Sequence, residues 1–195
     1  MKKQIISQSS YKVSKWSGGE TTEVFLYPPE GHYALNEFDY RVSTAKVELE
    51  ESTFSSLPGY KRIIMSLDNP LELHHRGKEG LRKVKLAPYQ INYFSGDDTT
   101  KSFGKCTDFN LIYSPKIGGE MKTKQSNEKI NLKKGVTYIL YALEVVEVIF
   151  HESTESVCLE MGTSLVIDEI EEDSIVSIQS ATKNKAPVLV EISIR

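Results

Sequence analysis

The feature that most constrains this chain is a series of short, apolar β-strand patterns that recurs every roughly 8–12 residues. These segments are rich in Val, Ile, Tyr and Phe, and Gly, Pro, Asn or Asp separates them. No window carries the apolar i, i+3, i+4, i+7 stripe that an amphipathic helix requires. The pattern predicts an all-β sandwich or barrel with helix confined to short turns. The expected strands are 23–27, 40–49, 61–67, 71–75, 81–86, 90–94, 109–113, 137–142, 145–150, 156–160, 164–168, 175–179 and 188–194.

A polar segment over residues 118–131 interrupts this pattern and has no periodicity. We interpret residues 114–132 as a connection between two β-rich halves. This predicts an N-terminal module over residues 1–115, which holds the pocket, and a smaller C-terminal module over residues 116–195. A chain of 195 residues buries roughly 70% of its unfolded surface, so it needs no disulfide or metal to hold it together.

Charge and apolar runs exclude several classes of protein. The 24 Lys and Arg residues are interspersed with 27 Asp and Glu residues, whereas a nucleic-acid-binding face requires clustered cations. The apolar run behind Lys2 and Lys3 is too short for a signal peptide, and no run is long enough for a membrane span. Cys106 and Cys158 lie far apart, which favours reduced thiols in a cytoplasmic protein; a single disulfide bridge stays open.

The histidines and glycines do not form a known cofactor motif. His74 and His75 are adjacent on an expected strand, so their side chains point to opposite faces and cannot easily hold one ion together. His32 and His151 stand alone. The chain also lacks the GxGxxG and GxxxxGK[ST] phosphate loops and the GxSxG nucleophile motif. We therefore expect neither a metal nor another cofactor.

The expected strand 40–49 carries polar residues on its inward face. Alternation puts Arg41 and Ser43 on one side with Ala45, Val47 and Leu49, and three of these five are small or apolar. If this face points inward, Arg41 is buried and must be paired, because an isolated buried charge costs several kcal/mol. The alternative is a strand that frays near Ser43 and leaves Arg41 exposed.

A second mixed strand follows Cys106. Asp108 and Asn110 share one face of it, opposite Phe109 and Leu111. Either this is an ordinary half-buried strand with a wet face, or Asp108 and Asn110 line a cavity and are the partners that Arg41 requires. The sequence pattern leaves both open.

Several of these pieces resemble the HutD/Ves family of bacterial cupin-like proteins. The matching blocks run in family order over most of the chain, with a weaker match over residues 161–165. They are Trp16-x-x-Gly19, Phe38-Asp-Tyr-Arg41-Val-Ser43-Thr-Ala45, Phe54-Ser55-x-x-Pro58-Gly59-Tyr-Lys-Arg62, Phe94-Ser-Gly96-Asp97 and Asp108-Phe109-Asn110. Ser17, Glu20 and Thr53 depart from the family pattern, which puts the identity of the ligand in doubt more than the fold.

The resemblance implies a bicupin, with two RmlC-type jelly-roll barrels in one chain. It also implies a small-molecule-binding or regulatory role linked to histidine utilisation or stress response. The family positions implied at the cavity of the first module are Trp16, Glu23, Arg41, Ser43, Arg62, Asp108 and Asn110. The C-terminal module carries few motif residues, so we expect it to serve packing.

We expect a metal-free protein that binds a small acidic metabolite, such as an intermediate of histidine degradation. Arg41, helped by Arg62, would clamp the carboxylate, with Trp16 as an apolar wall. One alternative is a metal-independent isomerase or hydrolase with Glu23 or Asp108 as general base. Another is a structural protein in which these residues only brace the fold. We expect no nucleic acid or membrane partner, and a homodimer stays open.

Overall fold

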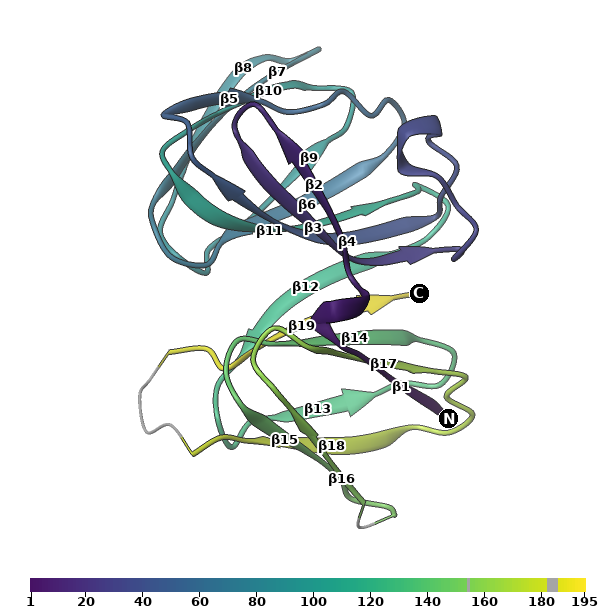
Figure 1. Cartoon of the computed structure of the whole chain (residues 1–195). Helices are drawn as coiled ribbons and strands as arrows, with labels where there is room; N and C mark the ends of the chain where they lie inside the picture. The colour runs from purple at the N-terminus through teal and green to yellow at the C-terminus, as the bar shows by residue number, and fades with distance from the viewer. Residues whose placement is uncertain (154, 182–185) are drawn as a thin grey trace. The chain divides into compact units, whose positions relative to one another are not determined.

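The computed structural model describes residues 1–153, 155–181 and 186–195, and every regular element of note in them is a β-strand (Figure 1). Within these residues, helix is limited to the 3₁₀ turns η1 (Gln8–Ser10) and η2 (Tyr33–Leu35). The expected all-β class is confirmed. None of the helical segments in the described residues is long and apolar enough to cross a bilayer.

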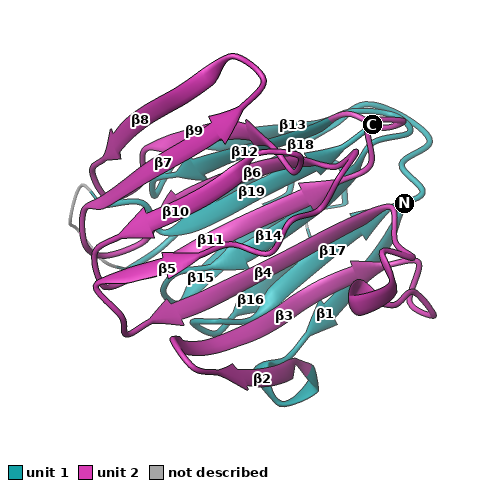
Figure 2. Ribbon diagram, turned by 90° about the horizontal axis from the view of Figure 1, so that it is seen from above, with its two compact units in different colours: residues 1–10, 119–195 teal, residues 11–118 magenta. Residues whose placement is uncertain are grey.

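The chain divides into two compact units, coloured separately in Figure 2. Unit 2 comprises residues 11–118, and unit 1 comprises residues 1–10 together with residues 119–195. The sequence analysis placed the first ten residues in the N-terminal module. In the structure they belong with the C-terminal unit, because β1 (Lys2–Ile6) pairs antiparallel with β17 (Ser164–Asp168).

Unit 2 contains two antiparallel sheets. The six-stranded sheet has the order β2 (Lys12–Trp16), β3 (Gly19–Tyr27), β4 (Tyr40–Val47), β11 (Cys106–Tyr113), β6 (Lys61–Ser66), β9 (Ile91–Ser95). The four-stranded sheet has the order β5 (Glu51–Thr53), β10 (Thr99–Phe103), β7 (Leu71–Gly77), β8 (Gly80–Leu86). A core cluster joins the sheets, with Ile64 and Phe94 from the first and Leu73 from the second. Each fully buried aliphatic side chain contributes roughly 1.5–3 kcal/mol.

Unit 1 has the same kind of construction. Its five-stranded sheet has the order β1, β17, β14 (Thr137–Ala142), β19 (Leu189–Ile194), β12 (Gly119–Lys124). Its four-stranded sheet has the order β13 (Lys129–Leu132), β18 (Ser174–Gln179), β15 (Val146–Phe150), β16 (Ser156–Leu159). Leu140 and Leu189 from one sheet and Val148 and Val176 from the other are fully buried in one cluster.

The polar segment 118–131, expected to be a connection, contains two of these strands. β12 and β13 each lie at the edge of a sheet, where a strand has a partner on one side only. Met121 is the one fully buried side chain of β12, while Ile130 and Leu132 are buried on β13. Edge strands need few apolar residues, so their sequence pattern is weak.

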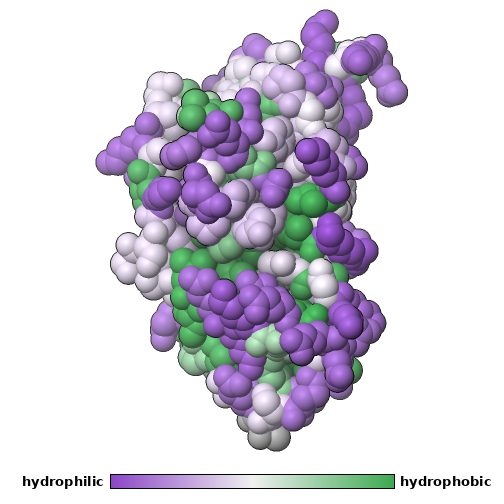
Figure 3. Space-filling view, turned by 90° about the vertical axis from the view of Figure 1, so that its right-hand side faces the viewer, coloured by the Kyte–Doolittle hydropathy of each residue, from purple (hydrophilic) through white to green (hydrophobic). Residues whose placement is uncertain are grey.

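Polar and apolar surface are mixed on the exterior. On the face drawn in Figure 3, hydrophilic side chains are interspersed with smaller apolar areas. This distribution matches the mixed charge of the sequence, whose formal net charge is −3.

Gly19 opens β3 and holds the β2–β3 hairpin close to β4. Its φ is +147°, and a Cβ at this position would lie 1.9 Å from the Lys46 carbonyl oxygen. The adjacent Gly18 lies under the Trp16 ring, since a Cβ there would approach that ring to 2.0 Å. The two glycines therefore have different roles: Gly19 allows the close strand approach, and Gly18 leaves room for the indole.

We predict that Gly19→Ala lowers the free energy of unfolding by more than about 3 kcal/mol, because backbone strain and overlap with a carbonyl act together. Gly80→Ala is the matched control: its φ is also positive, at +100°, but nothing lies within 4 Å of the added Cβ. It should cost about 1–3 kcal/mol from backbone strain alone. Urea unfolding of both variants measures the difference, and equal losses would contradict the steric account.

Candidate functional site

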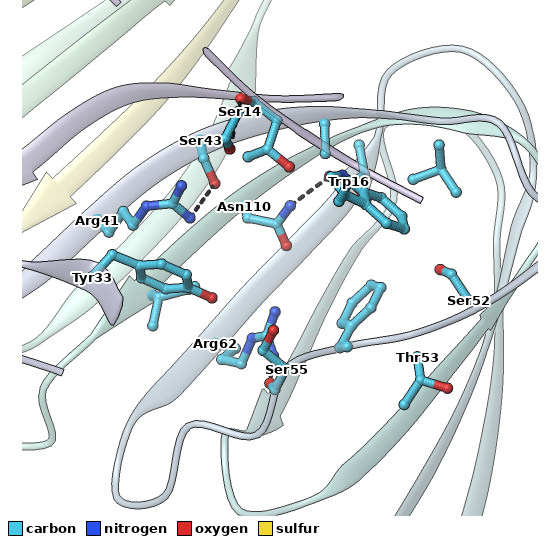
Figure 4. A pocket seen from close by; sticks show the side chains of 16 residues that line it. Ser14, Trp16, Tyr33, Arg41, Ser43, Ser52, Thr53, Ser55, Arg62 and Asn110 are labelled. Atoms are coloured by element: carbon cyan, nitrogen blue, oxygen red, sulfur yellow. Dashed lines mark hydrogen bonds between the residues drawn. The ribbon is translucent and has the colours of Figure 1, made fainter. Parts of the chain in front are cut away.

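Unit 2 encloses a cavity of about 330 Å³ that combines buried polar groups with apolar walls (Figure 4). This volume falls in the range of small-ligand pockets. Side chains of β2, β3, β4, β6 and β11 form one side, and β5 with the segment after it forms the other. The lining residues are Ser14, Trp16, Thr21, Tyr33, Arg41, Ser43, Ala45, Val47, Ser52, Thr53, Phe54, Ser55, Arg62, Asp108, Asn110 and Ile112.

Strand parity in β4 matches the sequence analysis. Arg41, Ser43, Ala45 and Val47 all line the cavity, and Arg41 is only 6% exposed. Leu49 was expected on the same face, but β4 ends at Val47 and Leu49 is 42% exposed. The inward direction of Arg41 is therefore confirmed, and the expected length of its strand was wrong.

Arg41 is paired with Glu23 rather than with Asp108 or Asn110, which corrects the expected partner. Arg41 Nε donates to Glu23 Oε2 at 2.8 Å, and Arg41 Nη1 donates to Ser43 Oγ at 3.2 Å. The cause is the β3–β4 register, which sets Glu23 opposite Ser43 and shifts at the next residue. Glu23 is thus diagonal to Arg41, within side-chain reach. The Tyr33 ring covers the guanidinium at 4.1 Å.

Arg62 contributes a second buried guanidinium from β6. It lies 4.9 Å from the Phe94 ring and 5.0 Å from the Phe54 ring, and its Nη1 donates to the Ser55 carbonyl at 3.0 Å. Its Nε has no hydrogen-bond partner among the described residues. Burial lowers the pKa of Arg62 to about 10, so the group is still charged at neutral pH. A buried, charged donor without a partner is costly unless a ligand satisfies it.

Asp108 and Asn110 bond to each other on β11. Asn110 Nδ2 donates to Asp108 Oδ1 at 2.5 Å, and Asp108 is only 2% exposed. Burial raises the pKa of Asp108 to about 7, against the opposing effects of the Asn110 hydrogen bond and the Arg62 charge. Asn110 Oδ1 is buried and has no hydrogen-bond partner within the described part of the chain. Two buried polar atoms on cavity-lining side chains thus lack a partner within the described residues: Arg62 Nε, a donor, and Asn110 Oδ1, an acceptor.

Six of the seven candidate residues face this cavity; Glu23 does not line it but bonds to Arg41. Trp16 is 39% exposed at one side of the pocket, on the edge strand β2. The sequence analysis gave no role to Tyr33, Phe54 or Phe94. Phe54 and Phe94 belong to the quoted family blocks, whereas no sequence signal singled out Tyr33.

The histidines take structural positions. His75 is 1% exposed, and its Nδ1 lies 2.9 Å from Thr100 Oγ1 while Asn92 Nδ2 donates to its Nε2 at 3.0 Å. Burial lowers the pKa of His75 to about 4, so the ring is neutral at pH 7. His74 bonds to Glu72 on the other side of the strand. Across residues 1–153, 155–181 and 186–195, no group of three His, Cys, Asp or Glu side chains is arranged to hold a metal ion.

Comparison with known proteins settles the relationship that these residues indicate. The family model described as HutD matches residues 8–186. The chain belongs to the HutD family. This family is linked to histidine utilisation. No curated protein sequence matches the chain.

Solved structures extend the comparison to the fold. The conserved protein of unknown function PA5104 from Pseudomonas aeruginosa PAO1 is 22% identical, with a TM-score of 0.82 over 100% of this chain and 99% of that one. HutD from Pseudomonas fluorescens SBW25 is 23% identical, with a TM-score of 0.76 over 99% and 98%. The bacterial pirin YhhW from Escherichia coli, solved with nickel(II), is 7% identical, with a TM-score of 0.65 over 99% and 98%. These likenesses confirm the all-β bicupin architecture.

For this HutD-family chain, we predict that Arg41→Met lowers the free energy of unfolding by about 3 kcal/mol, because the largely buried Glu23 side chain then keeps only the exposed Lys12 as an ion-pair partner, at 3.9 Å. Arg41→Met combined with Glu23→Leu should cost less than the single change, since no unpaired charge remains. The exposed pair of Lys46 and Glu48 is the control, and Lys46→Met should have no measurable effect. Urea unfolding measures each loss of free energy. If the double change costs as much as Arg41→Met and Glu23→Leu added together, the pairing is contradicted.

We also predict that Asp108→Asn makes the protein relatively more stable as pH rises. The pKa of Asp108 is about 7 when folded and near 3.8 when unfolded, so the folded state holds more protons between these values. Its contribution to stability therefore falls as pH rises from about 4 to 7, by up to about 1.4 kcal/mol for each pH unit. The measurement is the stability difference between variant and wild type, because His75 contributes the opposite slope.

The control for this pH series is Asp97→Asn, an exposed carboxylate whose Oδ1 accepts from the Gly59 amide, as an Asn oxygen can. In this control variant, the free energy of unfolding should depend on pH as it does in wild type. A difference between Asp108→Asn and wild type that stays constant from pH 4 to pH 8 would show that Asp108 ionises at its ordinary pKa.

Proposed function

We propose that the unit 2 cavity binds a small carboxylate-bearing metabolite. The observation that carries this proposal is Arg62 Nε, a buried and charged donor that has no partner within the described residues and belongs to a cavity-lining side chain. Arg41 lines the same cavity, but its charge is balanced by Glu23 at 2.8 Å. Carboxylates are the usual partners of guanidinium groups, because two N–H donors match two oxygens.

The two arginines have different tasks in this proposal. Glu23 and Ser43 hold Arg41 in place and Glu23 neutralises its charge, so Arg41 braces the wall of the cavity. Arg62 is held by its aromatic neighbours and by Ser55, which leaves its Nε for the ligand. Because both arginine side chains are fixed before the ligand binds, less conformational entropy is lost on binding. Arg62 therefore takes the principal role that the sequence analysis assigned to Arg41.

The ligand should also carry a hydrogen-bond donor. Asn110 Nδ2 is committed to Asp108, while Asn110 Oδ1 is a buried acceptor without a partner in the described chain. A site built to bond a donor disfavours ligands that lack one, because its own acceptor then stays unsatisfied. This supports hydroxy- or amido-carboxylates over plain fatty acids.

Family context supports an acidic metabolite of histidine degradation and a regulatory, cytoplasmic role. The HutD family is linked to histidine utilisation, and the Pseudomonas fluorescens HutD structure is described as a formate condition. Formate is the smallest carboxylate. Cys106 and Cys158 are both free thiols, in keeping with a reducing compartment.

A metal-independent isomerase or hydrolase is the second candidate, and the raised pKa of Asp108, about 7, favours it. A carboxyl group that titrates near neutrality and lines a cavity can act as general acid or base. Glu23 is the weaker candidate base, because it bonds to Arg41 and does not line the cavity. Chemical change of a bound carboxylate, followed by NMR, would favour the enzyme.

The test uses Trp16, the chain's one tryptophan, as a fluorescent reporter at the pocket. Formate, glycolate and propionate are titrated; glycolate and propionate have the same number of heavy atoms, but only glycolate carries a hydroxyl donor. We predict that all three perturb the fluorescence and that glycolate binds roughly tenfold more tightly than propionate, which corresponds to about 1.4 kcal/mol.

Two variants examine the roles of the lining residues. Arg62→Gln should weaken glycolate binding at least about tenfold, whereas Lys61→Gln, an exposed neighbour on β6, should leave it unchanged. Asn110→Leu should remove the preference for glycolate over propionate. Circular dichroism verifies that each variant is folded. Equal binding by folded wild type and Arg62→Gln would refute the proposed anion site.

A further inference from the structure

The cavity is balanced in charge when it is empty. Arg41 is neutralised by Glu23 at 2.8 Å. This leaves Arg62 as the other buried cation and Asp108 as the buried acid whose charge acts on it. A carboxylate ligand adds a second negative charge beside one available cation.

Asp108 accepts hydrogen bonds from Asn110 Nδ2 and from the Ala45 backbone, and both favour its ionised form, but neither partner carries a charge. Asp108 is opposite Ala45 on β4 and Ser66 on β6, and neither side chain carries a charge. The charged or titratable groups that face it or act on it are Arg41 on β4, Arg62 on β6, Cys106 on its own strand, Asp68 in the turn after β6, Tyr33 on η2 and, through Arg62, His75 on β7. Asp68 is itself negative, so it adds to the repulsion.

We propose that Asp108 takes one proton from solvent when a carboxylate enters the cavity, so that this site binds an anion and a proton together. The inference rests on the proposed function. In the binding step the ligand carboxylate becomes the counter-ion of Arg62, and a proton from water forms an O–H bond on the Asp108 carboxyl group. The total charge of the cavity is the same before and after binding.

Two physical facts support this coupling. Two carboxylates that share a buried site cannot both stay ionised without a large cost, so one of them is protonated. Asp108 is only 2% exposed, which prevents solvent from screening the repulsion. Its pKa is already about 7, so an added anion moves its titration above the neutral range.

No neighbouring group replaces Asp108 in this role. Burial raises the pKa of Cys106 to about 12, so its thiol is protonated in both states. The pKa of His75 is about 4, and its two ring nitrogens already lie within hydrogen-bond distance of Thr100 and Asn92. The ligand carboxylate itself has an ordinary pKa near 4 and is held by an arginine, which keeps it ionised.

The coupling gives affinity a defined pH dependence. Below the pKa of Asp108 in the free protein, the acid is already protonated and affinity is flat. Above that value, affinity falls by up to tenfold for each pH unit, until the pKa of the ligand-bound state is reached. The cavity would therefore fill on mild acidification and empty as the pH rises, at constant metabolite concentration.

The experiment is isothermal titration of glycolate into the full chain at pH 7.5, in Tris and in HEPES. These buffers absorb different amounts of heat when they give up a proton, so the difference between the two binding enthalpies counts the protons taken up. We expect more than about half a proton per glycolate. Asp108→Asn should take up none and should bind at pH 8.5 more tightly than wild type, while Asp97→Asn, an exposed carboxylate that is not among the groups acting on Asp108, should take up as many protons as wild type.

The outcomes separate this inference from the proposed function. No glycolate binding between pH 6 and pH 9 overturns the carboxylate site itself. Binding with the same enthalpy in both buffers overturns the proton coupling alone, as does proton uptake that persists in Asp108→Asn. If Asp108→Asn does not fold, the ¹³C signal of the Asp108 carboxyl carbon in wild type decides: its titration midpoint should rise when glycolate is added, and an unchanged midpoint contradicts the inference.

Discussion

The constraint that shapes the interior of unit 2 is the burial of two arginine side chains, Arg41 and Arg62, among apolar residues. Arg41 is neutralised by Glu23, whereas Arg62 is flanked by Phe54 and Phe94 and keeps one unsatisfied donor. Burying a guanidinium costs several kcal/mol unless each charge and donor is matched. The Glu23 pair meets this cost within the fold, whereas Arg62 Nε has no partner among the described residues. In the proposed function, Arg41 is therefore the brace and Arg62 the recognition group.

The fold could be predicted where strands alternate strongly and lie within a sheet. β4, β6, β11, β14 and β19 have dense apolar patterns, and all of them have partners on both sides. The edge strands β1, β2, β5, β12 and β13 were missed, because one partner and a wet face require few apolar residues. β10 was missed for another reason: it is internal, but its buried side chains are Thr100 and Ser102. The assignment of β1 to unit 1 rests on pairing between distant residues, which local patterns do not contain.

The residues of the site could be predicted, but the ion pairs and hydrogen bonds between them could not. Alternation in β4 and β11 grouped Arg41 with Ser43 and Asp108 with Asn110 but left their direction open, and the family resemblance brought them to one cavity with Trp16 and Arg62. The pairing of Arg41 with Glu23 depends on a register shift in β3, and no residue type marks that shift. The raised pKa of Asp108 depends on complete burial, which only the closed barrel provides. Sequence thus indicated which side chains meet, while the pairing between strands decides which of them are satisfied.

The central claim is that a bound carboxylate accepts a hydrogen bond from Arg62 Nε. The most direct measurement is the ¹H–¹⁵N signal of the Arg62 Nε–H group, followed by NMR during a formate titration. The account predicts a saturable downfield shift of this proton, as expected for a new charge-assisted hydrogen bond, while the Arg41 Nε–H signal, already bonded to Glu23, moves little. An Arg62 signal that does not move, or an Arg41 signal that moves instead, would contradict it.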